Sequence, residues 1–155
     1  MNKKYSAEIP QTIKNTAPRA TLNYGVYEVS EDELQMLWQE QRGAMGDESG
    51  SIDQWFREEH KYGYNELLIP LGQMTYAGIV NAIIRDKYTQ ADMESITNNM
   101  AAVNAMFLQT LVTDGIINAT KYLKESINDE NTTKFKEMQE WRTMAKQIAK
   151  EIIKA

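Results

Sequence analysis

Apolar residues recur every three or four positions through the second half of the chain, and this spacing constrains the fold most strongly. A repeat near 3.6 residues places such side chains along one face of a helix that packs on a core. We expect one helix from Tyr76 to about Tyr88 and another from Thr89, with a break or bend at Gly115. A last helix is expected from about residue 132 almost to the end. The apolar positions that define these helices are Ile79, Val80, Ile83, Ile84, Met93, Ile96, Met100, Val103, Phe107, Leu111, Ile116, Ile117, Ala119, Tyr122, Leu123, Phe135, Met138, Trp141, Ala145, Ile148 and Ile152.

Two shorter helices are expected earlier in the chain. Ser30 can cap the first, because its hydroxyl can accept a hydrogen bond from the Glu33 amide while the Glu33 side chain reaches back. The apolar face of this helix consists of Leu34, Leu37 and Trp38. The second helix is expected within residues 51–60, with Trp55 and Phe56 as its anchors. Residues 43–50 contain three glycines and are expected to form a flexible loop between the two.

The first 29 residues show no helical period. Pro10 and Pro18 fix their own backbone and favour extended geometry in the residue before them, so we expect an extended arm. Residues 20–29 alternate loosely between apolar and polar side chains, which supports one short strand. Such a strand needs a partner for its amides and carbonyls. Its apolar positions include Leu22, Tyr24 and Val26.

The predicted fold class is therefore mainly α. It consists of an extended arm over residues 1–29 and a helical domain of four to six helices over residues 30–155, with at most one short strand. A chain of this length most often forms one domain.

Charge is distributed unevenly along the chain. Residues 1–20 have four basic and one acidic residue, and residues 134–155 have six basic and three acidic, so each end carries +3. Residues 21–133 have seven basic and eighteen acidic residues and carry −11, which returns the net −5 of the whole chain. The basic ends could pair with the acidic body, within a chain or between neighbours, or the charge could simply be solvated.

Basic residues four positions apart share one side of the last helix. These residues could form a solvated face or a docking surface for an acidic partner, and the sequence leaves both interpretations open. Together with Trp141 on the same helix and the apolar positions of the expected strand, these basic residues give a candidate interface. Its residues are Leu22, Tyr24, Val26, Trp141, Arg142, Lys146 and Lys150.

No catalytic or metal site is predicted. The chain has no cysteine and one histidine, His60, which we expect at the surface, and it has no glycine fingerprint for phosphate or nucleophile chemistry. Glu58 and Glu59 are adjacent, so on a helix they would diverge by about 100° and not face one substrate. Three acids near the glycine-rich loop lack the spacing of a calcium-binding loop; these are Asp47, Glu48 and Asp53. We therefore expect no enzyme, no cofactor and no metal.

Nucleic-acid and membrane partners are not expected either. The body is acidic, and phosphate binding normally requires a larger basic footprint. The longest strongly apolar stretch, Leu67–Leu71, is too short to cross a bilayer and contains Pro70.

Two segments carry a resemblance to a known group of proteins. Residues 76–96, together with Asn98 and Asn99, and residues 138–146 resemble small structural proteins encoded by tailed phages and prophages of gut bacteria. The resemblance implies a virion component made in the cytoplasm of the bacterial host: an adaptor, a head decoration or the base of a fibre. It implies contacts with other virion proteins and with copies of the same chain. The alternatives are a soluble regulatory or chaperone-like interaction protein and a small carboxylate-dependent hydrolase.

Overall fold

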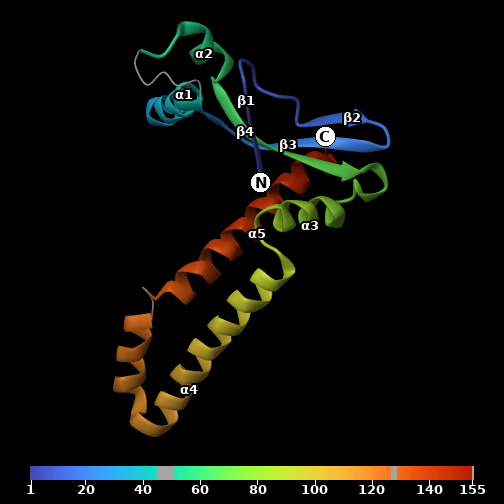
Figure 1. The fold of residues 1–155 in the computed structure, drawn as a ribbon. Helices are drawn as coiled ribbons and strands as arrows, with labels where there is room; N and C mark the ends of the chain where they lie inside the picture. The colour runs from blue at the N-terminus through green and yellow to red at the C-terminus, as the bar shows by residue number, and fades with distance from the viewer. Residues whose placement is uncertain (45–50, 127–128, 155) are drawn as a thin grey trace. The chain divides into compact units, whose positions relative to one another are not determined.

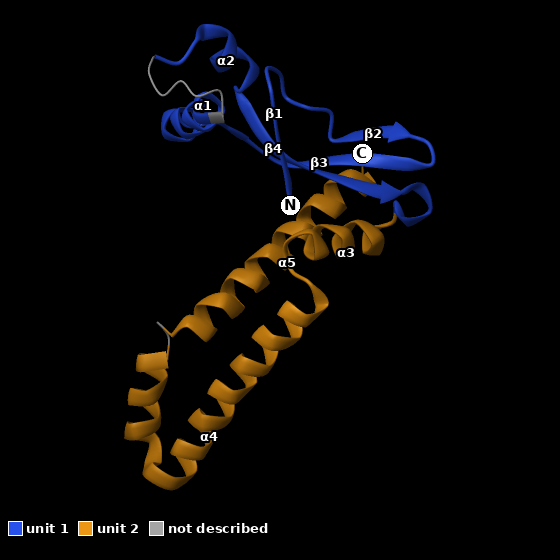
Figure 2. Ribbon diagram, viewed as in Figure 1, with its two compact units in different colours: residues 1–74 blue, residues 75–155 orange. Residues whose placement is uncertain are grey.

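A computed structural model describes residues 1–44, 51–126 and 129–154, and the chain forms two compact units, residues 1–74 and 75–155 (Figures 1 and 2). The predicted division into residues 1–29 and 30–155 instead cuts through the first unit. Part of the expected glycine-rich loop, with Asp47 and Glu48, lies outside the described residues.

The first unit contains a four-stranded antiparallel sheet, so the predicted fold class with at most one strand is wrong. The strands are β1 (Asn2–Ser6), β2 (Ile13–Thr16), β3 (Arg19–Glu28) and β4 (Tyr62–Pro70), in the spatial order β1-β4-β3-β2. Three of them come from the segment predicted to be an extended arm. The strand that joins β3 to β1 is β4, which was not predicted from the sequence. Edge strands with mostly polar side chains, as in β1 and β2, leave no alternating pattern to detect.

The register of the two central strands buries a small apolar set. Leu22 of β3 lies opposite Leu67 of β4, and Ala20 lies opposite Ile69. Ala20, Leu22, Tyr24 and Ile69 are almost fully buried. Between Tyr24 and Tyr27 the register shifts, and Gly25 supplies the positive φ of 63° that this irregularity requires.

Two helices of the first unit share a second small core. The helices α1 (Glu31–Ala44) and α2 (Gln54–Glu59) contribute Leu34, Trp38 and Phe56, and Ile52 joins them. The rings of Trp38 and Phe56 meet edge to face with centroids 5.0 Å apart, a favourable aromatic geometry. A short 3₁₀ turn, Leu71–Gln73, ends the unit.

One carboxylate joins three elements of this unit. Oε1 of Glu33, in the first turn of α1, accepts hydrogen bonds from Nζ of Lys3 at 2.6 Å, from the Tyr5 hydroxyl at 3.0 Å and from the Tyr27 hydroxyl at 2.7 Å. Ser30 caps α1 as predicted, since its hydroxyl accepts from the Glu33 amide at 3.3 Å, but the Glu33 side chain that was expected to reach back to it contacts β1 and β3 instead. These hydrogen bonds from Lys3, Tyr5 and Tyr27 join α1 to β1 and β3 of the sheet.

The same cluster shifts the pKa of each group. Burial opposes the charged form of Glu33, but the hydrogen bonds from Lys3, Tyr27 and Tyr5 outweigh it, so the pKa of Glu33 lies below its ordinary value. Hydrogen bonds to Glu33 and Tyr27 raise the pKa of Lys3. Burial, followed by the hydrogen bond to Glu33, raises the pKa of Tyr5 to about 12. The cluster therefore stays charged and paired through the neutral range.

The second unit consists of helices, as the apolar spacing predicted. They are α3 (Tyr76–Lys87), α4 (Gln90–Ser126) and α5 (Glu130–Lys154). The helix expected from Thr89 is confirmed, and Thr89 caps it: its hydroxyl accepts from the Asp92 amide at 3.1 Å, and the Asp92 carboxylate accepts from the Thr89 amide at 2.9 Å. The helix α3 packs on α5. The buried residues of this pair are Ile79, Val80, Ile83, Ile84, Met138, Ala145 and Ala149.

We predict that Glu33→Gln destabilises the first unit by about 1 to 3 kcal/mol, because three donors lose a charged acceptor. A carboxyl whose folded-state pKa is lowered contributes its stability above its unfolded pKa, near 4.5, and loses it as the pH falls through the lower folded value. The variant should therefore lose less stability than the wild type as the pH falls below about 5. Urea unfolding followed by circular dichroism at several pH values measures both effects.

Asp32→Asn is the matched control, since Asp32 shares the first turn of α1 and only its favourable position near the helix end is lost. Equal destabilisation by the two substitutions would contradict the role given to the Glu33 cluster.

Candidate interaction surface

The backbone of α4 reverses direction at Gly115. This residue has φ 81° and ψ 176°, which are not helical, so α4 consists of two arms, residues 90–114 and 116–126. Figure 1 shows the turn between the arms, where the yellow ribbon passes into orange. These angles are accessible almost only to glycine. The break or bend predicted at this position is therefore confirmed, and it separates a long arm from a short one.

Large apolar side chains of α4 are exposed around this reversal. Among the described residues of α4 only Ala119 and Ser126 are buried. Val112 is 84% exposed and Ile117 82%, values that are unusual for branched aliphatic side chains. We call the following residues the α4 apolar surface: Met106, Leu108, Leu111, Val112, Ile116, Ile117 and Leu123.

Threonines on the same helix add little polarity to this surface. The hydroxyls of Thr97, Thr110, Thr113 and Thr120 each donate to the carbonyl four residues earlier, at 2.7 to 2.9 Å. A hydroxyl satisfied by its own helix needs no partner from outside. No residue from Ser95 to Thr113 is charged. The long arm is therefore less polar outside than its composition suggests.

The helix α4 is also the one described helix that is long and apolar enough to span a membrane by length and composition, and none of its qualifying window is buried. The expectation of no membrane partner considered only Leu67–Leu71, which lies mostly in β4. Gly115 interrupts the helix, and amide side chains lie along the long arm at Asn98, Asn99, Asn104 and Gln109. Amides are costly in hydrocarbon, whereas water or a protein partner can satisfy them.

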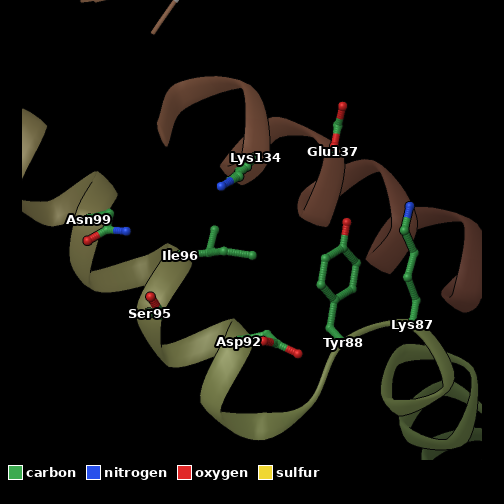
Figure 3. Close-up of a pocket in the computed structure, with 8 residues that line it drawn as sticks. All are labelled: Lys87, Tyr88, Asp92, Ser95, Ile96, Asn99, Lys134 and Glu137. Carbon is green, nitrogen blue, oxygen red and sulfur yellow. The ribbon is translucent and has the colours of Figure 1, made fainter. Parts of the chain in front are cut away.

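A pocket of about 440 Å³ lies between the start of α4 and the start of α5 (Figure 3). Three of its four charged groups already have roles in the fold. Lys134 pairs with Glu130, Lys87 lies 4.6 Å from the centre of the Trp141 ring, and Asp92 caps α4. Hydrogen bonds from Thr89 hold the pKa of Asp92 below its usual value. Two lysines and two acids line the pocket, so it has no net charge to attract an ion. The remaining lining residues are Tyr88, Ser95, Ile96, Asn99 and Glu137.

His60 has a structural environment. Its ring stacks on Phe56 with centroids 3.9 Å apart and lies 5.3 Å from the Tyr5 ring, and its Nδ1 lies 2.8 Å from the Phe56 carbonyl oxygen. It is half-buried, not fully at the surface as expected. Glu58 and Glu59 are exposed, and no group of three metal-binding side chains occurs within the described part of the chain.

The residues of the predicted interface occupy different environments. Leu22 and Tyr24 are buried in the sheet, whereas Val26 is 40% exposed. Trp141 is half-buried and its Nε1 donates to the Ile83 carbonyl at 3.0 Å, so the ring fixes α5 to α3. The remaining three are half-buried or exposed on α5; they are Arg142, Lys146 and Lys150. The α4 apolar surface was not predicted, although the uncharged run from Ser95 to Thr113 is a signal for it in the sequence.

Comparison with known proteins finds no protein family whose model matches this chain, and no curated protein or solved structure that is similar to it.

We predict that Gly115→Ala destabilises the second unit by about 1 to 3 kcal/mol, because an alanine at this φ and ψ is strained. A Cβ at Gly115 would meet nothing within 4 Å, so the cost arises in the backbone alone. Thermal or urea unfolding followed by circular dichroism measures the change.

Gly43→Ala is the control, since Gly43 lies in α1 and a Cβ there also meets nothing within 4 Å. Alanine at this helical position should be neutral or stabilising by up to about 1 kcal/mol. A stabilising effect at both glycines would mean that α4 does not reverse at Gly115.

Proposed function

We propose that this protein is a structural component of a tailed-phage particle and that it acts through protein–protein contacts. The α4 apolar surface carries the proposal. Monomeric soluble proteins rarely expose large contiguous apolar patches, and such patches mark sites of association. The resemblance of residues 76–96 and 138–146 to phage structural proteins supports the setting, and the kinds of neighbour are other virion proteins and copies of this chain.

The magnitude of the available burial favours assembly in which both partners contribute. Full burial of one large aliphatic side chain is worth roughly 1.5–3 kcal/mol, so the six leucine, isoleucine and valine side chains of this surface supply at most about 9–18 kcal/mol. Association itself costs about 4–15 kcal/mol. One α4 apolar surface against a polar partner would therefore gain little. Two apolar surfaces, or repeated contacts in a particle, would gain enough.

Charge also favours contact at α4 over contact elsewhere. The stretch 21–133 carries −11, so copies of the protein repel one another over most of this body. Residues 67–84 and 95–113 are the two long uncharged runs of this stretch, and the second lies on α4, where neighbours can approach without that repulsion.

A chaperone-like interaction protein is the second candidate. Met106 is half-exposed on α4, with Met93 and Met100 partly exposed on the same helix. Methionine is flexible and suits surfaces that accept several partners. A protein of this kind would bind virion or host chains in the cell and would be absent from finished particles. No catalytic step is part of either proposal.

Quantitative mass spectrometry of purified particles of the encoding phage tests the proposal. We expect this protein at a fixed copy number relative to the major capsid protein. The double variant Val112→Ser and Ile117→Ser should enter particles at least tenfold less, since it removes two of the most exposed apolar side chains while helicity stays unchanged.

Val26→Ser is the comparison variant, because Val26 is an exposed valine on β3 of the first unit. It should enter particles normally. Absence of the wild-type protein from particles would overturn the proposal, and loss through Val26→Ser alone would move the interface to the sheet.

A further inference from the structure

A second apolar row runs along the long arm of α4, on a side of the helix that packs on nothing described. Ala101, Ala105, Leu108 and Val112 follow one another at steps of four, three and four, and Asn98 precedes them by three. All five are exposed. This is the spacing of the contact positions of a coiled coil. We call these residues the outer stripe.

The outer stripe is distinct from the row that packs within the second unit. That inner row, Met93, Ile96, Met100, Val103 and Phe107, is half-buried. With 3.6 residues per turn, the centres of the two rows lie about 130° apart around the helix. A second helix can therefore dock on the outer stripe without displacing the inner row.

We infer that the outer stripe binds the outer stripe of a second copy of this chain, with the two α4 helices antiparallel. The inference deepens the proposed function, because it identifies the first neighbour in the assembly as another copy. The pairing is isologous: each copy presents the same residues to its partner.

Charge selects a copy as the occupant. Coiled coils choose and reject partners through charged residues that flank the contact positions. Here the flanking residues of the stripe are all uncharged: Ser95, Thr97, Ala102, Asn104, Gln109 and Leu111. These flanking residues carry no charge that would attract a partner of opposite sign, and none that would repel an identical helix. A second copy supplies an uncharged helix of the same length and spacing.

Side-chain size selects the antiparallel direction. The stripe has small residues at one end, Ala101 and Ala105, and large ones at the other, Leu108 and Val112. An antiparallel copy places Ala101 opposite Val112 and Ala105 opposite Leu108, so that large side chains meet small ones and the helices approach closely. A parallel copy would instead set alanine against alanine and large side chains against large ones, so that some layers are underfilled and others crowded. It would also set Glu94, one heptad before Ala101, against its own copy.

Leu108→Glu against Met106→Glu tests the docking surface in the full-length protein. Both residues are exposed to a similar degree, 58% and 50%, and both variants add one negative charge to the same helix. Only Leu108 belongs to the outer stripe. By sedimentation equilibrium we expect Leu108→Glu to raise the dissociation constant of the dimer at least tenfold and Met106→Glu to change it less than threefold. Circular dichroism should give the same helicity for both variants.

Cysteine cross-linking tests the direction, and the absence of native cysteine leaves only the introduced thiols to react. An oxidised equimolar mixture of Ala101→Cys and Val112→Cys proteins should give mainly the mixed dimer, identified by mass spectrometry after digestion. In the control mixture Ala102→Cys, which lies beside the stripe, replaces Ala101→Cys. This mixture should give at least fivefold less mixed dimer. Homodimers of Ala101→Cys in excess over the mixed species would overturn the antiparallel arrangement.

Three further results would overturn the inference. These are a wild-type protein that stays monomeric at all concentrations, equal weakening by the two glutamate variants, and a monomer whose α4 instead inserts into neutral phosphatidylcholine vesicles. The proposed function can fail separately. A dimer that is absent from particles would contradict the virion role and support the inference. A monomer that is present in particles at a fixed copy number would support the virion role and contradict the inference.

Discussion

The helix α4 has apolar side chains on two sides, and the described residues of the second unit pack against only one of them. This constraint shapes the rest of the unit. The inner row is half-buried, while Val112, Ile116 and Ile117 remain largely exposed around the reversal at Gly115. Monomeric soluble proteins rarely expose an apolar surface of this kind, and such surfaces mark sites of interaction. This is why we propose that the protein associates through α4.

The two units solve the problem of stability in different ways. In the first, the edge strand β1, the central strand β3 and the helix α1 are joined by one carboxylate, Glu33, which accepts from Lys3, Tyr5 and Tyr27. In the second, α3 and α5 bury an apolar seam, and a hydrogen bond from Trp141 to the Ile83 carbonyl joins the two helices. The first unit therefore adds a charged hydrogen-bond cluster to its two small apolar cores, and we expect it to lose stability in acid, whereas the α3–α5 pair relies on apolar burial.

The helices could be predicted from the sequence and the sheet could not, for a physical reason. Helical periodicity and caps such as Ser30 and Thr89 are local, so the sequence contains them directly. β1 is mostly polar, and it finds its partner β4 only some sixty residues later, a pairing that no local pattern encodes. The exposed apolar surface of α4 was not predicted for a related reason. Spacing shows which face of a helix is apolar, but not whether the folded chain provides a neighbour for it. The candidate interface predicted from the sequence therefore lay on residues of β3 and α5.

Self-association of the unmodified chain is the most direct test of this account. Sedimentation velocity of the full-length protein over a hundredfold range of concentration, without detergent or lipid, measures it. The account predicts a shift from monomer to dimer with rising concentration, and loss of that shift in the Leu108→Glu variant. A single monomeric species throughout, with the same helicity, would contradict it.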